Sequence, residues 1–272
     1  MDTFVECVNH VIQHHTAQNI ESFRVDRTLL LPKTEHLHRT RLPPNHSAYL
    51  DRWIQFAADK KVQKLDLIMC IFDPRYEFPY LVFPDEEKEQ TLKHLSLGNC
   101  ILNLPSKFTN FSSLVSLTLN RGPLTQVNLT NILSNCLSLE WLSIRRCVCP
   151  EHLKFTSLKL KHLNIINHFP LRIDIVDLEN LVSFEFSGII ILKKFVCNKN
   201  AQVRRACFYG CYPPGGDVDY AIRGRLARDF PQLETLLITS FPTEVNLDDI
   251  HFDNIYFSNI IQLIHVCFSG KS

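Results

Sequence analysis

The residues of this 272-residue chain that come closest to forming a chemical site are cysteines, of which there are ten. One residue separates Cys147 from Cys149, and Cys207 lies four residues before Cys211. Zinc sites usually combine paired ligands at tighter, repeated spacings. A zinc site is the strongest alternative to a role in packing for these cysteines. Because their spacing is not the usual one for zinc ligands, we expect neither a metal nor another cofactor.

Catalytic motifs are the second kind of chemistry to consider. The Ser-Gly-Lys-Ser at 269–272 resembles the end of a phosphate-binding loop, but His265 stands where that loop needs its first glycine. The chain holds no G-x-S-x-G and no H-E-x-x-H motif. No carboxylate stands out from the charged background, so we predict no catalytic residues and no enzymatic activity.

Composition narrows the class of protein further. The chain is 45% hydrophobic and 21% charged, which is typical of an ordered protein. Its net charge of +1 gives no general attraction to nucleic acid or to an anionic membrane. The basic stretch at 193–228 is either a solvated edge or a patch for an acidic partner. RNA binding would need aromatic residues interleaved with the charges, and although Phe195, Phe208, Tyr209 and Tyr212 are present, the repeat already uses Phe208 for the core.

Neither a membrane span nor a signal peptide is apparent. No apolar run approaches the roughly 18 residues that a spanning helix needs. The first fifteen residues, MDTFVECVNHVIQHH, lack the charged-then-apolar layout of a secretory signal. We therefore expect a cytoplasmic or nuclear protein, or both, with reduced cysteines.

An internal repeat organises the chain. The pattern L-x-x-L-x-L, with Ile, Val, Phe or Ala allowed in place of Leu, recurs at spacings that mostly fall in or near the about 20–29 residues of leucine-rich repeats. The clearest copies begin at Val62, Leu92, Leu114, Leu139, Leu160, Leu181 and Leu233, and weaker ones begin at Ile20, Val203 and Ile260.

The spacing of the repeat predicts the fold. The last two apolar positions are two residues apart, so they share one face of a short strand, and stacked repeats place these strands in one parallel sheet. We predict an α/β leucine-rich-repeat solenoid, curved, with that sheet on its concave face. We expect a single domain over 1–272, with an N-terminal capping region at 1–61, the clearest repeats at 62–240 and a degenerate C-terminal repeat at 241–272.

The segments between the strands should carry the helices. Apolar residues recur at helical spacing in 4–15, 47–59 and 217–230. The repeats between 139 and 203 are only 21 or 22 residues apart, which leaves room for a turn or one short helix. The position eight residues after each repeat start holds Cys70, Cys100, Cys147 and Cys211, where many leucine-rich repeats have Asn or Cys. We therefore assign these cysteines to a structural ladder.

Several stretches resemble a known family. DRWIQFAADKKVQKLDL at 51–67 is similar to the part of plant F-box/LRR proteins in which a D-R-W-I helix leads into the first clear repeat. The segments at 4–25, 89–100 and 133–147 resemble the region just upstream and the later repeats of those proteins. The resemblance covers roughly 4–240 and is of the FBD-associated type.

This resemblance implies the substrate-recognition part of an SCF-type ubiquitin ligase. In such proteins an N-terminal F-box binds a Skp-family adaptor and the repeats select a protein target. The F-box should precede the region matching Phe4, so we expect adaptor binding only if an F-box is encoded upstream of Met1. The alternative is a truncated or decayed paralogue that acts as a binding scaffold without a link to ubiquitin.

The predicted binding surface is the concave sheet face, because its residues can vary while the alternating apolar residues hold the core. Trp, Tyr and Arg are the residue types most enriched at binding hot spots. We predict that partner binding uses Trp141, Arg145, His162, Arg205 and Tyr209. The alternative for Trp141 is that it packs on a neighbouring residue of the same face.

Overall fold

The chain folds as two compact units. The computed structural model describes residues 3–27, 46–166, 172–187, 195–197, 202–210, 230–240 and 262–267. Unit 1 comprises Met1–Pro123 and Asn135–Leu139, and unit 2 comprises Leu124–Ser134 and Glu140–Ser272. The expectation of one domain over 1–272 stays a prediction.

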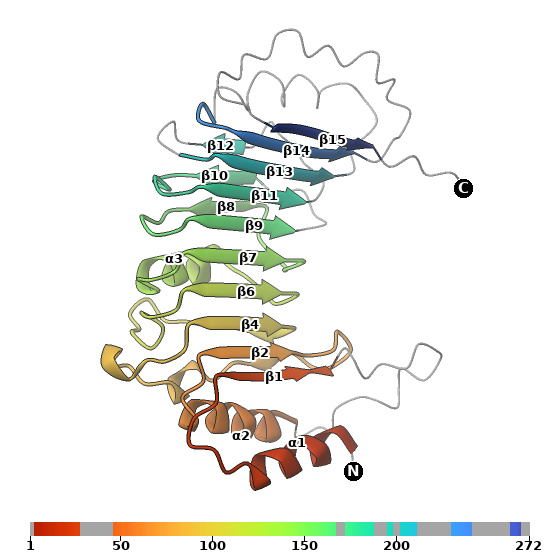
Figure 1. Cartoon of the computed structure of the whole chain (residues 1–272), viewed down its shortest axis with the longest axis vertical. Helices are drawn as coiled ribbons and strands as arrows, with labels where there is room; N and C mark the ends of the chain where they lie inside the picture. Colours follow the sequence, from red (N-terminus) through yellow and green to blue (C-terminus); the bar gives the residue numbers. More distant parts are fainter. Residues whose placement is uncertain are drawn as a thin grey trace, which may run out of the picture. The chain divides into compact units, whose positions relative to one another are not determined.

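Unit 1 contains four parallel strands that follow one another in chain order (Figure 1). Each strand has its first residue directly before the second apolar position of a predicted repeat, so Lys64 aligns with both Ser22 and His94, and His94 aligns with Ser116. The weak copy that begins at Ile20 is therefore a genuine repeat. These strands are β1 (Ser22–Asp26), β2 (Lys64–Ile68), β4 (His94–Gly98) and β6 (Ser116–Asn120).

Unit 2 repeats the same arrangement with six parallel strands (Figure 1). Its register is also in step with the repeat, since Trp141 aligns with His162, His162 with Ser183, and Ser183 with Arg205. The strands are β7 (Trp141–Arg145), β9 (His162–Ile166), β11 (Ser183–Ser187), β13 (Arg205–Gly210), β14 (Thr235–Ser240) and β15 (Gln262–Cys267). The predicted leucine-rich-repeat fold is confirmed.

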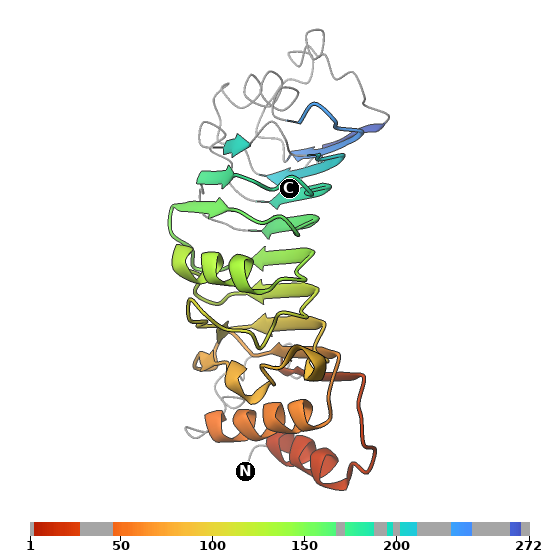
Figure 2. The same cartoon turned by 90° about the vertical axis from the view of Figure 1, so that its left-hand side faces the viewer.

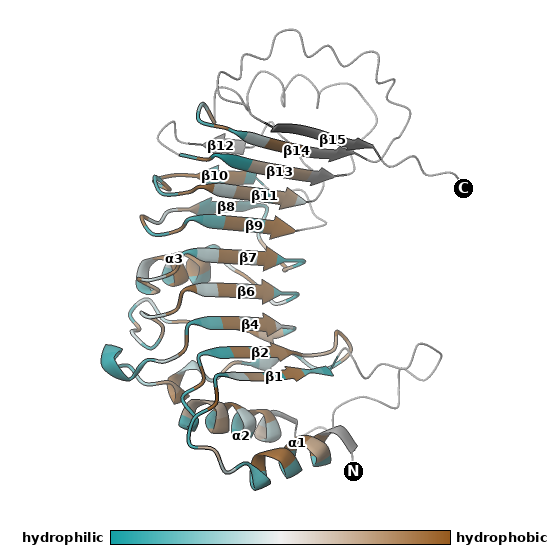
Figure 3. Ribbon diagram, in the orientation of Figure 1, coloured by the Kyte–Doolittle hydropathy of each residue, from teal (hydrophilic) through white to brown (hydrophobic). Residues whose placement is uncertain are grey.

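Alternation along each strand produces the core. In β7 the second and fourth residues, Leu142 and Ile144, are fully buried, whereas Trp141 and Arg145 are exposed. The same alternation buries Leu163 and Ile165 in β9. In Figure 3, strands such as β2, β4 and β9 begin in the hydrophilic colour and turn hydrophobic along their length. Hydrophobic burial of these side chains stabilises the stack.

The return segments of unit 1 include two helices and several shorter elements. The helices are α1 (Thr3–His14) and α2 (His46–Asp59), close to the predicted ranges 4–15 and 47–59. The indole of Trp53 is fully buried and donates a hydrogen bond to Asn9 Oδ1 at 2.8 Å, which joins the two helices. The shorter elements are the strands β3 (Tyr76–Glu77) and β5 (Cys100–Ile101) and the 3₁₀ turns η3 (Tyr80–Val82) and η4 (Glu87–Glu89).

The return segments of unit 2 differ from our expectation of turns and short helices. One helix, α3 (Gln126–Asn135), is present, and the later segments form a second parallel sheet of β8 (His152–Phe155), β10 (Arg172–Ile175) and β12 (Phe195–Cys197). Figure 2 shows α3 and these short strands on the opposite side of the unit from the long strands. The expectation of a single sheet was incomplete because strands cross a short repeat in fewer residues than helices do.

The turns after the strands contain the predicted cysteine ladder. Cys70, Cys100 and Cys147 are all buried, as the register predicted. The thiol of Cys100 contacts its own turn at Gly98 O, but the side chain that bridges neighbouring repeats is Asn99, which donates from Nδ2 to Cys70 O at 2.7 Å. Asn99 has a left-handed φ of 55°, a conformation that asparagine tolerates well. The ladder position Cys211 and the predicted helix at 217–230 lie outside the described residues, apart from Phe230.

Candidate protein-binding face

The long strands of unit 2 present three rows of outward side chains. We call this surface, made by the first, third and fifth residues of each strand, the outward face of unit 2. The strand register aligns these residues across the sheet. From β7 to β13, the first row is Trp141, His162, Ser183 and Arg205, the middle row is Ser143, Asn164, Glu185 and Cys207, and the last row is Arg145, Ile166, Ser187 and Tyr209.

All five of the predicted binding residues belong to these rows. Trp141, His162 and Arg205 share the first row, whereas Arg145 and Tyr209 share the last row. Because two strand spacings separate β9 from β13, the backbones at His162 and Arg205 are about 10 Å apart. The backbone of Tyr209 pairs with the neighbouring strands, and its side chain is not among the described parts of the chain.

Trp141 and His162 form an aromatic pair at one end of the first row. Their ring centroids are 4.9 Å apart and their planes are inclined by 34°. Trp141 nevertheless keeps 43% of its surface exposed, so packing on a neighbour and presenting a binding surface are compatible for this residue. Aromatic side chains that are partly exposed and held in place lose little conformational entropy on binding.

The charge of His162 is controlled by its surroundings. Burial lowers the pKa of His162 below its ordinary value of 6.5, and the positive charges of Lys161 and Arg205 lower it further, while Glu140 acts in the opposite direction. The imidazole is therefore mainly neutral at pH 7. The neutral ring packs against Trp141 in a tilted arrangement and adds no further positive charge to the face.

Two arginines on this face have no ion-pair partner in the described part of the chain. Arg145 and Arg205 are exposed, and none of the described acidic side chains lies within ion-pair distance of them. The outward face of unit 1 differs, because Arg24 contacts Asp26 at 2.6 Å and Asp66 at 3.8 Å, and Lys64 contacts Asp66 at 3.8 Å. Among the described strands, those of unit 2 therefore present cations that have no acidic partner in the described part of the chain.

The middle row is recessed and polar, which we did not anticipate. Ser143 and Asn164 are 5% and 8% exposed, and Asn164 Nδ2 donates a hydrogen bond to Glu185 Oε2 at 2.5 Å. Asn164 Oδ1 is buried without a hydrogen-bond partner among the described residues. The signal for this pair was present in the sequence, because residues 164 and 185 differ by the 21-residue repeat and must therefore be neighbours.

Nothing in the described ranges gathers metal ligands. No group of three or more His, Cys, Asp or Glu side chains could hold a metal ion there. Burial raises the pKa of the Cys149 thiol to about 12, with a further contribution from Cys147, so Cys149 is a neutral thiol at pH 7. A search of the same residues for a helix long and apolar enough to cross a bilayer also gave none.

The arrangement of the first row can be checked by titration. Replacing Arg205 with Ala should raise the pKa of His162, because the neighbouring positive charge that opposes protonation is removed. The shift should be small, since the ring is partly solvated and salt screens the interaction. NMR titration of the His162 ring protons measures it, with Lys159→Ala as an exposed lysine control. If the titration midpoint of His162 is unchanged in Arg205→Ala, the charge of Arg205 does not reach His162 in solution.

A stack of parallel strands with an aromatic and cationic outward face defines the class of protein: a leucine-rich-repeat interaction domain. The comparisons with known proteins place it more narrowly. The family described as At1g61320/AtMIF1, LRR domain, matches residues 14–256, which is well over half of the chain. The chain belongs to this family.

Two curated relatives from Arabidopsis thaliana carry F-box names. F-box/LRR-repeat protein 25 is 29% identical over 159 residues, covering 58% of this chain and 54% of that protein. F-box protein At5g03100 is 32% identical over 118 residues, covering 43% of this chain and 36% of that protein. The matched regions thus span about half and about a third of these relatives. No solved structure matches.

Proposed function

We propose that the chain is a protein-recognition module that binds a partner protein through the outward face of unit 2. The observation that supports this most is the exposed Trp141, which is held against His162 on the same face as Arg145 and Arg205, two arginines with no acidic partner among the described residues. Each of these residues points away from the core, so the fold does not require its identity. The proposal gives the chain no catalytic role.

The chemistry of the face suggests the chemistry of the partner. Exposed arginines attract carboxylate or phosphate groups, which guanidinium binds in a bidentate manner. The Trp141 ring offers an apolar platform in the same row. We therefore propose a partner segment that places an apolar side chain on Trp141 and acidic groups near Arg145 and Arg205.

The finer role that we propose is target recognition for an SCF-type ubiquitin ligase. It is supported by the names of the two relatives, an F-box/LRR-repeat protein and an F-box protein. In this role the repeats hold the target in the cytoplasm or nucleus. A Skp-family adaptor binds only if an F-box is encoded upstream.

Binding of the partner should depend on the first row of the face. A partner is first captured by proximity labelling and confirmed with purified components. Trp141→Ala and Arg205→Ala should each weaken its affinity by about 2–4 kcal/mol, or roughly 30- to 1000-fold. Calorimetric titration measures the loss.

The matched controls lie elsewhere on unit 2. Val127 is 67% exposed on α3, and Lys159 is exposed in the turn before the repeat at Leu160. Val127→Ala and Lys159→Ala should leave the affinity within about twofold of the parent, as expected for residues outside an interface. If both first-row variants bind with the parental affinity and Val127→Ala does not bind, the partner docks on the α3 side and the proposed face is wrong.

The ligase role has its own test. If the partner is a ligase target, raising the level of this protein in cells should shorten the half-life of the partner, and a proteasome inhibitor should restore it. Binding without any change in the partner's half-life would favour the alternative role, a binding scaffold with no link to ubiquitin.

A further inference from the structure

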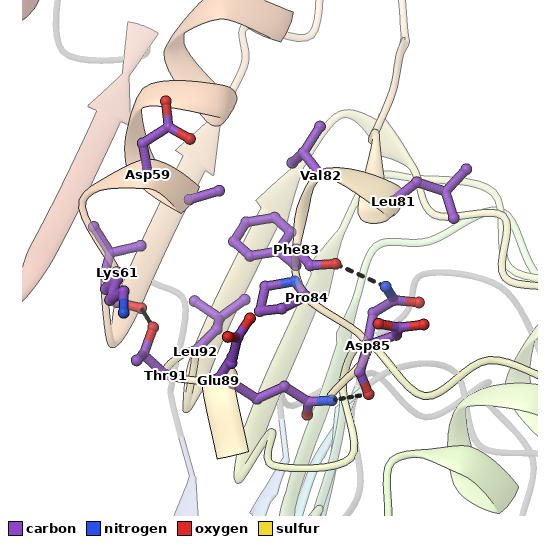
Figure 4. A pocket seen from close by; sticks show the side chains of 14 residues that line it. Asp59, Lys61, Leu81, Val82, Phe83, Pro84, Asp85, Glu89, Thr91 and Leu92 are labelled. Carbon is purple, nitrogen blue, oxygen red and sulfur yellow. Dashed lines mark hydrogen bonds between the residues drawn. The ribbon is translucent and has the colours of Figure 1, made fainter. Parts of the chain in front are cut away.

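A pocket in unit 1 is lined by residues outside the long strands of that unit. It has a volume of about 500 Å³ and lies between the end of α2 and the turns η3 and η4 (Figure 4). Pockets of about 300–1,000 Å³ are the usual size for small ligands and side-chain anchors. The pocket occupies the long spacing between the repeats that begin at Val62 and Leu92, where the chain has 30 residues in place of the usual 21 or 22.

The floor of the pocket is apolar and firmly built. Val62, Phe83 and Leu92 are 1%, 5% and 4% exposed. Asn110 Nδ2 donates a hydrogen bond to Phe83 O at 2.7 Å, and Thr91 Oγ1 donates one to Val62 O at 3.2 Å (Figure 4). Because these polar groups are already paired, the floor itself offers mainly apolar contact to a ligand.

The walls combine apolar surface with exposed carboxylates. Leu81, on η3, is 73% exposed and is the most exposed large hydrophobic side chain in the described ranges. Asp59, Asp85 and Glu89 also line the pocket, and none of them forms a salt bridge with any described residue. Figure 4 shows Glu89 beside Pro84 and Leu92, and shows Asp59 on the α2 side of the pocket.

The charges of the lining residues indicate what kind of ligand the pocket would bind. Lys61 is the one cation among the described lining residues, against three carboxylates. The ammonium of the preceding Lys60 is directed elsewhere, since its Nζ donates a hydrogen bond to Ala17 O at 2.6 Å. An apolar anion would therefore be repelled, whereas a cation with an apolar stem would satisfy both parts of the site.

We infer that this pocket is a second docking site, which takes a lysine or arginine side chain from a basic, leucine-containing segment of a partner protein. The aliphatic stem of the basic residue packs on Phe83 and Leu92, and its charged head reaches Asp85 and Glu89. A neighbouring apolar side chain of the same segment covers Leu81. This site is independent of the outward face of unit 2 and does not rest on the function proposed for that face.

Labelled peptides test the inference directly on the full chain. The probe is a fluorescein-labelled heptapeptide of alternating arginine and leucine, and its counterpart alternates glutamate and leucine. Fluorescence anisotropy should show saturable binding of the arginine peptide and none of the glutamate peptide. The double variant Asp85→Asn/Glu89→Gln should weaken the arginine peptide at least about tenfold, in keeping with the loss of two charge-assisted contacts. Leu81→Ser should weaken it about threefold or more, because exposed apolar contact is lost.

The matched control is Glu87→Gln, which removes the same charge from η4 at an exposed residue that does not line the pocket. This variant should bind the arginine peptide within about twofold of the parent. Melting curves should be unchanged for all of the charge variants, because residues 85, 87 and 89 are exposed. An equal loss in Glu87→Gln, or parental binding in the double variant, would overturn the site and indicate only general attraction to an acidic loop.

Discussion

Asp73→Ala should lower the free energy of unfolding by about 3–5 kcal/mol, because it removes the carboxylate that pairs with the buried Arg27 guanidinium. Arg27 and Asp73 have side chains that are 5% and 1% exposed, and Arg27 Nε lies 2.9 Å from Asp73 Oδ2. A second, longer contact of 3.4 Å joins Arg27 Nη2 to Asp73 Oδ1, and Asp73 Oδ2 also accepts the Cys70 amide at 3.1 Å. The carboxylate thus fixes the end of β1 to the turn after β2.

The control for this prediction is an exposed ion pair in unit 2. Glu140 and Lys161 are 2.7 Å apart, but their side chains are 44% and 47% exposed. Glu140→Ala should therefore cost only about 0–1 kcal/mol. Chemical denaturation of both variants measures the difference. A loss in Asp73→Ala no larger than that in Glu140→Ala would mean that the Arg27 pair does not hold the first repeats together.

Leu142→Ala should lower the free energy of unfolding by about 2–5 kcal/mol, because it leaves a cavity in the core of unit 2. Leu142 is fully buried and pairs in register with Leu163, which is 1% exposed. Trp141 is the adjacent residue on the opposite face of the same strand. Trp141→Ala should cost folding stability only about 0.5 kcal/mol, since its side chain is partly exposed.

The contrast between residues 141 and 142 is the informative measurement. A denaturation midpoint that is much lower for Leu142→Ala than for Trp141→Ala agrees with a buried Leu142 and an outward Trp141. The opposite ranking would place the Trp141 ring in the core and remove the basis for assigning it to partner binding.

The strands could be predicted from the sequence almost residue by residue. The repeat L-x-x-L-x-L indicates which residues are buried. Because successive side chains of a strand point to opposite faces, the residues between the buried ones must face outward. Lys64–Ile68 and Trp141–Arg145 therefore begin and end where the pattern indicates. The same register brought Trp141, His162 and Arg205 into one row.

The second sheet of unit 2 was missed although its signal is present. His152–Phe155 and Arg172–Ile175 alternate polar and apolar residues, and the apolar ones are buried. Four residues are too short for periodicity alone to separate a strand from a turn. Here the short repeat length decides, because a strand crosses the back of the unit in fewer residues than a helix.

Side-chain pairing was the part that sequence could not supply. The proximity of Asn164 and Glu185 follows from the register, but the burial of Asn164 and its hydrogen bond to Glu185 are seen only in the structure. The unpaired state of Arg145 and Arg205 within the described residues likewise depends on distances to every nearby acid. The pocket at Phe83 and Leu92 arises from an irregular insertion, for which a repeat pattern makes no prediction.

The most direct test of the account places a photo-crosslinker on each side of unit 2. A benzophenone amino acid at position 141 keeps an aromatic ring on the outward face, and the same group at position 127 reports from the exposed surface of α3. After irradiation of the purified complex, we expect a covalent adduct with the partner from position 141 and none from position 127. An adduct from position 127 with none from position 141 would contradict it.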